Sequence, residues 1–136
     1  EYLKLALENA SITQLAISTH LLNGPSTDFL ACLPHILNVS RGHDINHLVV
    51  ERQRTDDIQV SLFDDSNFYN FVEEAIRQFS TVKFNFTLYS YTRQIANEGW
   101  QQAAEKLATT FHIDSEVTIN QISNTRTTLS IFFSRP

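Results

Sequence analysis

The sequence predicts a single α+β domain, in which a mainly antiparallel sheet carries two amphipathic helices on one face and a helical layer at its N-terminal end. Three observations lead to this prediction. Two segments carry apolar residues at helical spacing, the segments around them alternate apolar and polar residues, and the first 40 residues contain helix start and stop signals. A chain of 136 residues fits one domain. We therefore expect one domain over 1–136, with a helical part (1–41) and a sheet-and-helix part (42–136) in the order ββ-α-β-α-ββ.

The N-terminal part is predicted to hold two helices. Ser11-Ile12-Thr13-Gln14 fits a capping box, and Asn23-Gly24-Pro25 is a stop signal. Thr27-Asp28 is suited to cap a second helix that ends near Arg41-Gly42. Pro34 lies inside this helix, so we expect a kink or a break there.

The segment that follows is predicted to be a β-hairpin. Leu48 and Val50 alternate with residues of the opposite parity, "RTDD" is suited to a turn, and Ile58, Val60 and Leu62 then repeat the alternation.

Two helices are predicted at 66–79 and at about 97–111. The first begins after a good N-cap pair, Asp65-Ser66. Both repeat apolar residues at i, i+3, i+4, i+7, i+8 and i+11, the stripe of an amphipathic helix. The stripes are Phe68, Phe71, Val72, Ala75, Ile76 and Phe79, and then Trp100, Ala103, Ala104, Leu107, Ala108 and Phe111.

Strands are predicted after each of these helices. "TVKFNFTLYS" alternates apolar residues from Val82 to Leu88, which indicates a strand with one buried face. "EVTINQISNTRTTLSIFFS" is typical of a hairpin that turns at Ser123-Asn124-Thr125-Arg126. In this hairpin, Val117 and Ile119 are expected opposite Leu129, Ile131 and Phe133.

Composition disfavours several classes of function. The net charge is −5 and the ten basic residues are scattered, whereas a nucleic-acid surface needs clustered Lys and Arg. Nothing approaches the roughly 20 consecutive apolar residues of a membrane span. Cys32 is the only cysteine, so no internal disulfide is possible, and a reducing, cytoplasmic compartment is expected. The sequence contains no methionine, so we expect a piece of a longer protein.

The segment "SRGHDINHLVVERQ" offers the clearest candidate for metal chemistry. In a helix, His43, His47 and Glu51 would share a face at metal-ligand spacing. In the predicted strand they would spread over about 26 Å, which is too far for one ion. We favour the strand and expect no metal, and we keep a metal-dependent enzyme built on these residues as the least favoured alternative.

Catalysis has no other support in the sequence. Cys32 and His35 would share a helix face, but Pro34 lies between them among apolar residues, which is more typical of a buried thiol. The acidic pairs lie in a predicted turn, an N-cap and a solvated helix face. We therefore expect neither an enzyme nor a cofactor.

The best candidate for a binding site is an aromatic and polar cluster. Tyr89, Tyr91 and Arg93 continue the predicted strand on the face opposite Phe84 and Phe86, and Trp100 follows closely in sequence. Amphipathic aromatic residues are favoured in sites for small ligands and partner proteins. A sheet-edge surface beside a half-buried Trp100 explains the same residues without any ligand.

The runs "ITQLAISTHLLNGPSTDFLACLPHILNVS", "HLVVERQRTDDIQVSLF" and "NFYNFVEEAIRQF" resemble the N-terminal effector-binding region of AraC/XylS-type transcription regulators. The resemblance covers residues 12–133 and consists of element order and apolar spacing, with no diagnostic motif. The upstream helical part of that family and its DNA-binding helix-turn-helix pair are absent from the sequence. The resemblance implies a sensory and dimerisation domain separated from its DNA-binding half.

These observations predict a non-catalytic regulatory domain that binds a small-molecule effector or mediates dimerisation. The alternative is a protein-interaction module of a larger assembly. One form of this alternative is a homodimer that pairs through an exposed edge strand such as 127–133. In that strand, Phe132 is expected to face away from the core.

Overall fold

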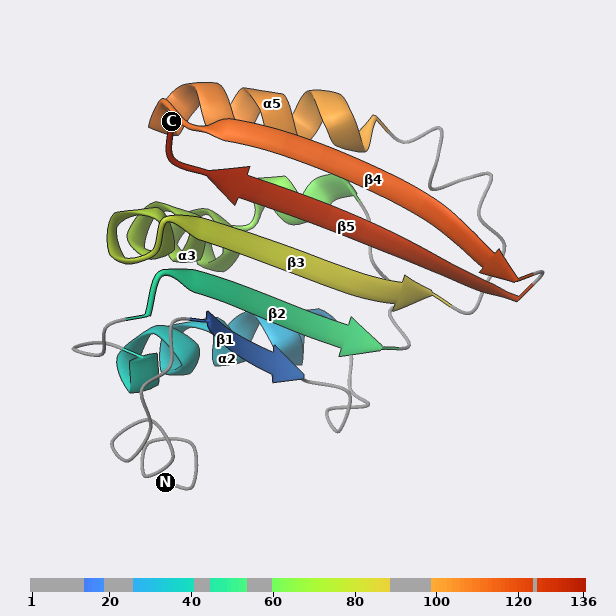
Figure 1. The fold of residues 1–136 in the computed structure, drawn as a ribbon, viewed down its shortest axis with the longest axis horizontal. Coiled ribbons are helices and arrows are strands. Elements are labelled where there is room, and N and C mark those ends of the chain that lie inside the picture. Colours follow the sequence, from blue (N-terminus) through green and yellow to red (C-terminus); the bar gives the residue numbers. More distant parts are fainter. Residues whose placement is uncertain (1–13, 19–25, 41–44, 54–59, 89–98, 124) are drawn as a thin grey trace.

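A computed structural model describes residues 14–18, 26–40, 45–53, 60–88, 99–123 and 125–136, and these residues form a layer of strands with helices against it (Figure 1). The elements follow one another as β1 (Gln14–Ser18), α2 (Ser26–Ser40), β2 (His47–Gln53), the 3₁₀ helix η1 (Val60–Asp64), α3 (Ser66–Gln78), β3 (Thr81–Leu88), α5 (Trp100–Phe111), β4 (Asp114–Ser123) and β5 (Arg126–Ser134). The predicted α+β class is confirmed.

The described strands form one mixed sheet in the order β1-β2-β3-β5-β4. β1, β2 and β3 are parallel to one another, whereas β5 runs antiparallel to both β3 and β4. The antiparallel pairings are the longer ones, as the prediction of a mainly antiparallel sheet requires. The sequence does not predict the parallel pairing of β1, β2 and β3.

The connections explain why the helices share one side of the sheet. Each of α2, α3 and α5 joins two strands that run in the same direction, and each connection advances the same way along the strand order. Crossovers of this kind are almost always right-handed, so successive crossovers in one direction place their helices on the same face. Figure 1 shows the three helices behind the strands. The described helices therefore cover one face of the sheet, and no described element covers the other, which we call the open face.

The core lies between the sheet and the helices. The strand residues that face it alternate with exposed or half-exposed ones, as in β3, where Val82, Phe84, Phe86 and Leu88 are fully buried. Phe84 is central, because its ring lies 4.9 Å from that of Phe68 and 5.7 Å from that of Phe71, both on α3. The α3 stripe is thus packed on the sheet as its spacing predicts.

The prediction of a helix that begins near Ser11 is wrong for the described residues 14–18, which form strand β1. These residues pair in parallel with β2, from Gln14 opposite His47 to Ser18 opposite Glu51. In "QLAIS", Leu15, Ala16 and Ile17 form a short apolar run, and such a run is compatible with a strand as well as with a helix. The hydrogen bonds that this segment forms with β2 stabilise the strand over the helix. The predicted stop signal lies outside the described residues.

The hairpin predicted at 44–63 is also wrong in its second half. Its first strand is confirmed as β2, with Leu48 and Val50 buried, but residues 60–64 form the helix η1. Leu62 and Phe63 are consecutive and both buried, whereas a strand would place them on opposite faces. A helical turn brings both into the core. The "RTDD" turn lies outside the described residues.

The remaining described elements form where the sequence predicts them, but the expectation of a break in α2 is wrong. Helix α2 continues through Pro34 as one helix, so the proline does not split it. The last two strands form the expected hairpin, with Val117 opposite Ile131 and Ile119 opposite Leu129. None of the described helices combines the length and apolar character needed to cross a membrane.

One prediction about the sheet edge is wrong. Strand β5, which contains residues 127–133, lies between β3 and β4 and is not an edge strand. Phe132 does point away from the core, since the buried residues of β5 are of the opposite parity. Among the described strands, the edges are β1 and β4.

Candidate functional site

Three residues of the predicted aromatic cluster, Tyr89, Tyr91 and Arg93, lie outside the described residues. The fourth, Trp100, begins α5 and is only 2% exposed. Its ring packs against Phe63 with centroids 5.8 Å apart. Trp100 is thus a core residue, and its ring packs against Phe63 within the core.

The structure describes only one member of the histidine pair considered as metal ligands. His43 lies outside the described residues, whereas His47 and Glu51 lie on the open face of β2. The Nδ1 atom of His47 is 2.7 Å from the Thr81 hydroxyl on β3, so this ring has a hydrogen-bond partner within the sheet. No group of three metal-ligating side chains is present in the part of the chain that the structure describes.

Cys32 lacks the surroundings of a reactive thiol. Burial raises its pKa above the ordinary value, and this outweighs the opposing effects of a backbone hydrogen bond and of the Arg52 charge. His35 is exposed on the same helix. A reactive cysteine needs a lowered pKa, so the environment of Cys32 fits a structural role.

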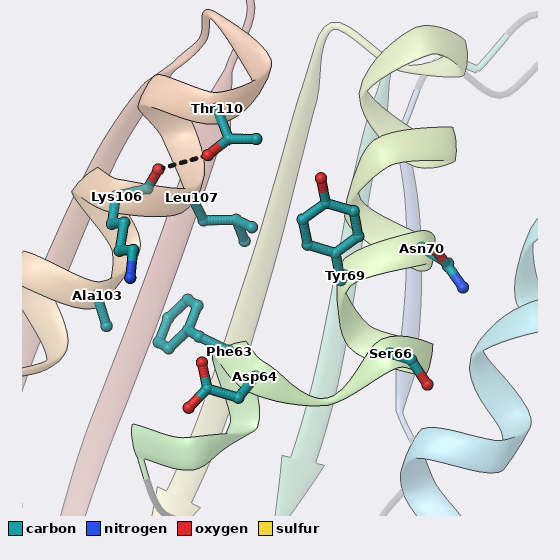
Figure 2. A pocket seen from close by; sticks show the side chains of 9 residues that line it. All are labelled: Phe63, Asp64, Ser66, Tyr69, Asn70, Ala103, Lys106, Leu107 and Thr110. Carbon is teal, nitrogen blue, oxygen red and sulfur yellow. Dashed lines mark hydrogen bonds between the residues drawn. The ribbon is translucent and has the colours of Figure 1, made fainter.

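The described residues form a pocket of about 600 Å³ between α3 and α5, lined at one end by η1 (Figure 2). We call it the α3–α5 pocket and define it by its lining. The lining residues are Phe63, Asp64, Ser66, Tyr69, Asn70, Ala103, Lys106, Leu107 and Thr110. Its volume lies within the range of sites that hold small molecules.

The floor and walls of the α3–α5 pocket are apolar. Phe63 and Leu107 are buried core residues that show one side to the pocket, and Ala103 is a small residue on the α5 stripe. The Tyr69 ring packs on Phe111 of α5 with centroids 4.9 Å apart, so the two helices are joined beside the pocket. Phe63 is held in turn by Phe68, with ring centroids 5.4 Å apart in an edge-to-face arrangement. The apolar surface is therefore built from rings fixed by the core.

The rim of the α3–α5 pocket is polar and charged. Figure 2 shows the Lys106 ammonium and the Asp64 carboxylate at the end of the pocket where Phe63 lies, and the Tyr69 hydroxyl at the other end. The Thr110 hydroxyl donates to the Lys106 carbonyl at 3.0 Å, a bond within α5. Within the described residues, no ion pair joins Lys106 to Asp64. Both charged residues therefore line the same end of the pocket as separate groups.

The open face of the sheet is a second, shallower candidate. The strand register places Val49, Lys83, Phe132 and Glu116 in one row across β2, β3, β5 and β4. Two hollows of about 300 and 340 Å³ flank this row, and both are lined in part by Lys83 and Phe132. The face is otherwise mostly hydroxyl and amide groups, with its own bonds, such as that from Ser130 to Asn85 at 2.7 Å. It lacks the fixed apolar walls of the α3–α5 pocket.

No model of a known protein family matches this chain, and no curated protein is similar to it at a significant level.

The sequence contained only part of the signal for the α3–α5 pocket. Phe63 falls at the end of the predicted hairpin, and Tyr69 and Lys106 lie next to the apolar stripes of their helices, where solvated residues are usual. Ala103 was the one available indication, because a small residue on an apolar stripe leaves space where a helix meets its neighbour. Which helix lies opposite that space depends on the fold.

Proposed function

We propose that this chain is a non-catalytic ligand-binding domain, whose small-molecule ligand occupies the α3–α5 pocket. The observation that carries the proposal is the combination of a fixed apolar floor, formed by Phe63 and Leu107, with polar groups that converge at the rim. Sites for small molecules commonly combine a mostly apolar lining with a few polar groups that orient the ligand.

The chemistry of the rim favours binding over catalysis. The Thr110 hydroxyl donates to a carbonyl of its own helix, which holds the side chain in place and does not activate it as a nucleophile. Lys106 and Asp64 are exposed at the rim. They are suited to attract and orient charged groups of a ligand. In the setting that the AraC/XylS-type resemblance implies, the chain would be a cytoplasmic effector-sensing part of a transcription regulator.

A thermal-shift screen against a broad metabolite library tests the proposal. A ligand at 100 times its Kd stabilises the folded state by about 2.7 kcal/mol. We expect some compound to raise the Tm of the wild type. We also expect Ala103→Phe, which places a ring in the pocket, to abolish that shift.

Thr109→Phe is the matched control, because Thr109 is exposed on α5 and does not line the pocket. It should respond as the wild type does. A saturating screen without any shift would overturn the proposal. So would a compound that stabilises Ala103→Phe as strongly as the wild type.

A second candidate function is self-association through β4. This strand is an edge of the described sheet, and Ile122 near its end is 62% exposed, the most exposed large apolar side chain in the described residues. An exposed strand edge with an apolar side chain is suited to pairing with another chain. Sedimentation at micromolar concentration tests this: a dimer that Ile122→Lys converts to a monomer supports it, and a monomeric wild type excludes it.

A further inference from the structure

We infer that the ligand of the α3–α5 pocket is a zwitterion with an apolar body, of which a large apolar α-amino acid is the simplest example. This inference rests on the proposed function and specifies the class of ligand. It is carried by two opposite charges, Lys106 and Asp64, that lie at the same end of one apolar pocket without pairing with each other.

The separation of the two charges is a consequence of the fold. Asp64 ends η1, whereas Lys106 lies on the second turn of α5, so the packing of these two elements sets how their side chains lie. Phe63 precedes Asp64 and is buried, with its ring fixed between Phe68 and Trp100. In the view of Figure 2, the Phe63 ring is drawn between the Lys106 ammonium and the Asp64 carboxylate, and all three residues line the pocket. The charged end of the pocket is therefore attached to a rigid part of the core.

Asp64 does not cap helix α3, whereas its neighbour Asp65 does. The Asp65 carboxylate caps α3, because its Oδ1 atom accepts from the backbone N–H groups of Asn67 and Phe68. Asp64 is exposed, and in the described residues no hydrogen bond or ion pair uses its carboxylate. The adjacent acids thus have different surroundings, and only Asp64 lines the pocket.

The charge pattern discriminates between ligands with the same apolar body. A monocarboxylate would gain the Lys106 cation but would bring its own negative charge close to Asp64. A monoamine would gain Asp64 but would approach Lys106. A molecule with both a cationic and an anionic group satisfies both rim charges, because like charges brought together oppose binding, and an α-amino acid carries these as an ammonium and a carboxylate group.

The remaining surface suits the body of such a ligand. Beyond the charged end, the pocket continues along Leu107 and the face of Tyr69 to the Tyr69 hydroxyl. An aromatic or long aliphatic side chain placed there would bury apolar surface, at about 25 cal/mol for each Å² removed from water. The inference therefore favours amino acids with large apolar side chains over small or polar ones.

Three probes with the same phenyl ring and chain length test the inference: L-phenylalanine, 3-phenylpropionate, which lacks the ammonium group, and 2-phenylethylamine, which lacks the carboxylate. Calorimetric or saturation-transfer titration of the wild-type chain should give a Kd for L-phenylalanine at least about tenfold lower than for either analogue. Equal or tighter binding of either analogue overturns the inference.

Two charge-removing variants add a readout that misfolding would not produce, because each should change the preference and not only the affinity. Asp64→Asn should lower the affinity for L-phenylalanine by about tenfold and raise the affinity for 3-phenylpropionate. Lys106→Gln should lower the affinity for L-phenylalanine by a similar factor and raise the affinity for 2-phenylethylamine. Asp114→Asn and Arg77→Gln are matched controls, since both residues are exposed and neither lines the pocket. They should leave all three affinities unchanged. Variants that keep the wild-type preference overturn the inference.

The failure of the inference is distinguishable from that of the proposed function. If none of the three probes binds but a library compound stabilises the wild type and not Ala103→Phe, the ligand is not this kind of zwitterion, and the pocket remains a binding site. If no compound of any kind binds, both are wrong.

Discussion

The side-chain carbonyl of Gln101 accepts a hydrogen bond from the backbone N–H of Val117 at 3.0 Å. Gln101 lies on the first turn of α5, and Val117 lies on β4, the last strand in the described sheet. A helix side chain therefore satisfies a strand N–H that has no further strand to pair with. This bond protects part of the β4 edge, and it leaves the stretch around Ile122 as the more accessible part.

Loss of the Gln101 acceptor should destabilise the protein. We expect Gln101→Ala to lower the free energy of unfolding by about 1 kcal/mol, because the Val117 N–H loses its partner in a partly buried place. Urea titration measures this change. Gln102→Ala is the control, since Gln102 is exposed on the same turn; equal losses for the two variants would show that the bond contributes nothing.

The burial of only one face of the sheet leads to a prediction about two phenylalanines on neighbouring strands. Phe84→Ala should lower the free energy of unfolding by about 3–5 kcal/mol, because Phe84 is fully buried against Phe68 and Phe71. Phe132→Ala removes the same ring from the open face of the neighbouring strand, and it should cost about 1 kcal/mol. Chemical denaturation of the two variants provides the comparison. If Phe132→Ala costs as much as Phe84→Ala, the open face is not open in solution.

The two adjacent acids before α3 should differ in their effect on stability. Asp65→Ala should cost about 1 kcal/mol, because its carboxylate accepts from the backbone N–H of Asn67 at 2.8 Å and of Phe68 at 3.3 Å. Asp64→Ala should change the stability by less than about 0.5 kcal/mol. Thermal unfolding of both variants without ligand measures the difference. A reversed order would mean that Asp64, and not Asp65, caps the helix.

The thiol of Cys32 should be slow to react. Burial raises its pKa above the ordinary value of 9.0, so less thiolate is present at pH 8 than in the unfolded chain. Alkylation by iodoacetamide at pH 8 should be several times slower in the folded protein than in urea. The rate should also continue to rise above pH 9, because deprotonation is shifted upward. A rate that levels off below pH 9 would contradict a raised pKa.

Much of the fold could be predicted from the sequence, because the strongest local patterns agree with the contacts that the fold provides. The stripe of α3 and the alternation of β3 each bury the expected residues, and Phe68 and Phe84 meet between them. Two of the errors, those at β1 and η1, concern segments where two local signals compete. "QLAIS" follows a capping signal but pairs with β2, and Leu62-Phe63 ends an alternating run but turns both side chains into the core.

The site was less predictable, because it belongs to no single segment. Phe63, Tyr69 and Leu107 come from η1, α3 and α5, and the pocket exists only where these elements meet. The sequence predicts Trp100 as part of a ligand-binding cluster, whereas in the structure it is a core residue that packs against Phe63. Local patterns identify which residues are buried, whereas a concave surface depends on how separate elements pack.

The most direct test of ligand binding in the α3–α5 pocket is a ¹H–¹⁵N correlation spectrum of the labelled protein, recorded while the tightest-binding compound of the library screen is added. We predict that the backbone amide signals of Tyr69, Ala103 and Leu107 shift with saturation, while those of Lys83 and Phe132 on the open face of the sheet do not. Saturable shifts confined to the open face, with the pocket amides unchanged, would contradict the assignment of the site.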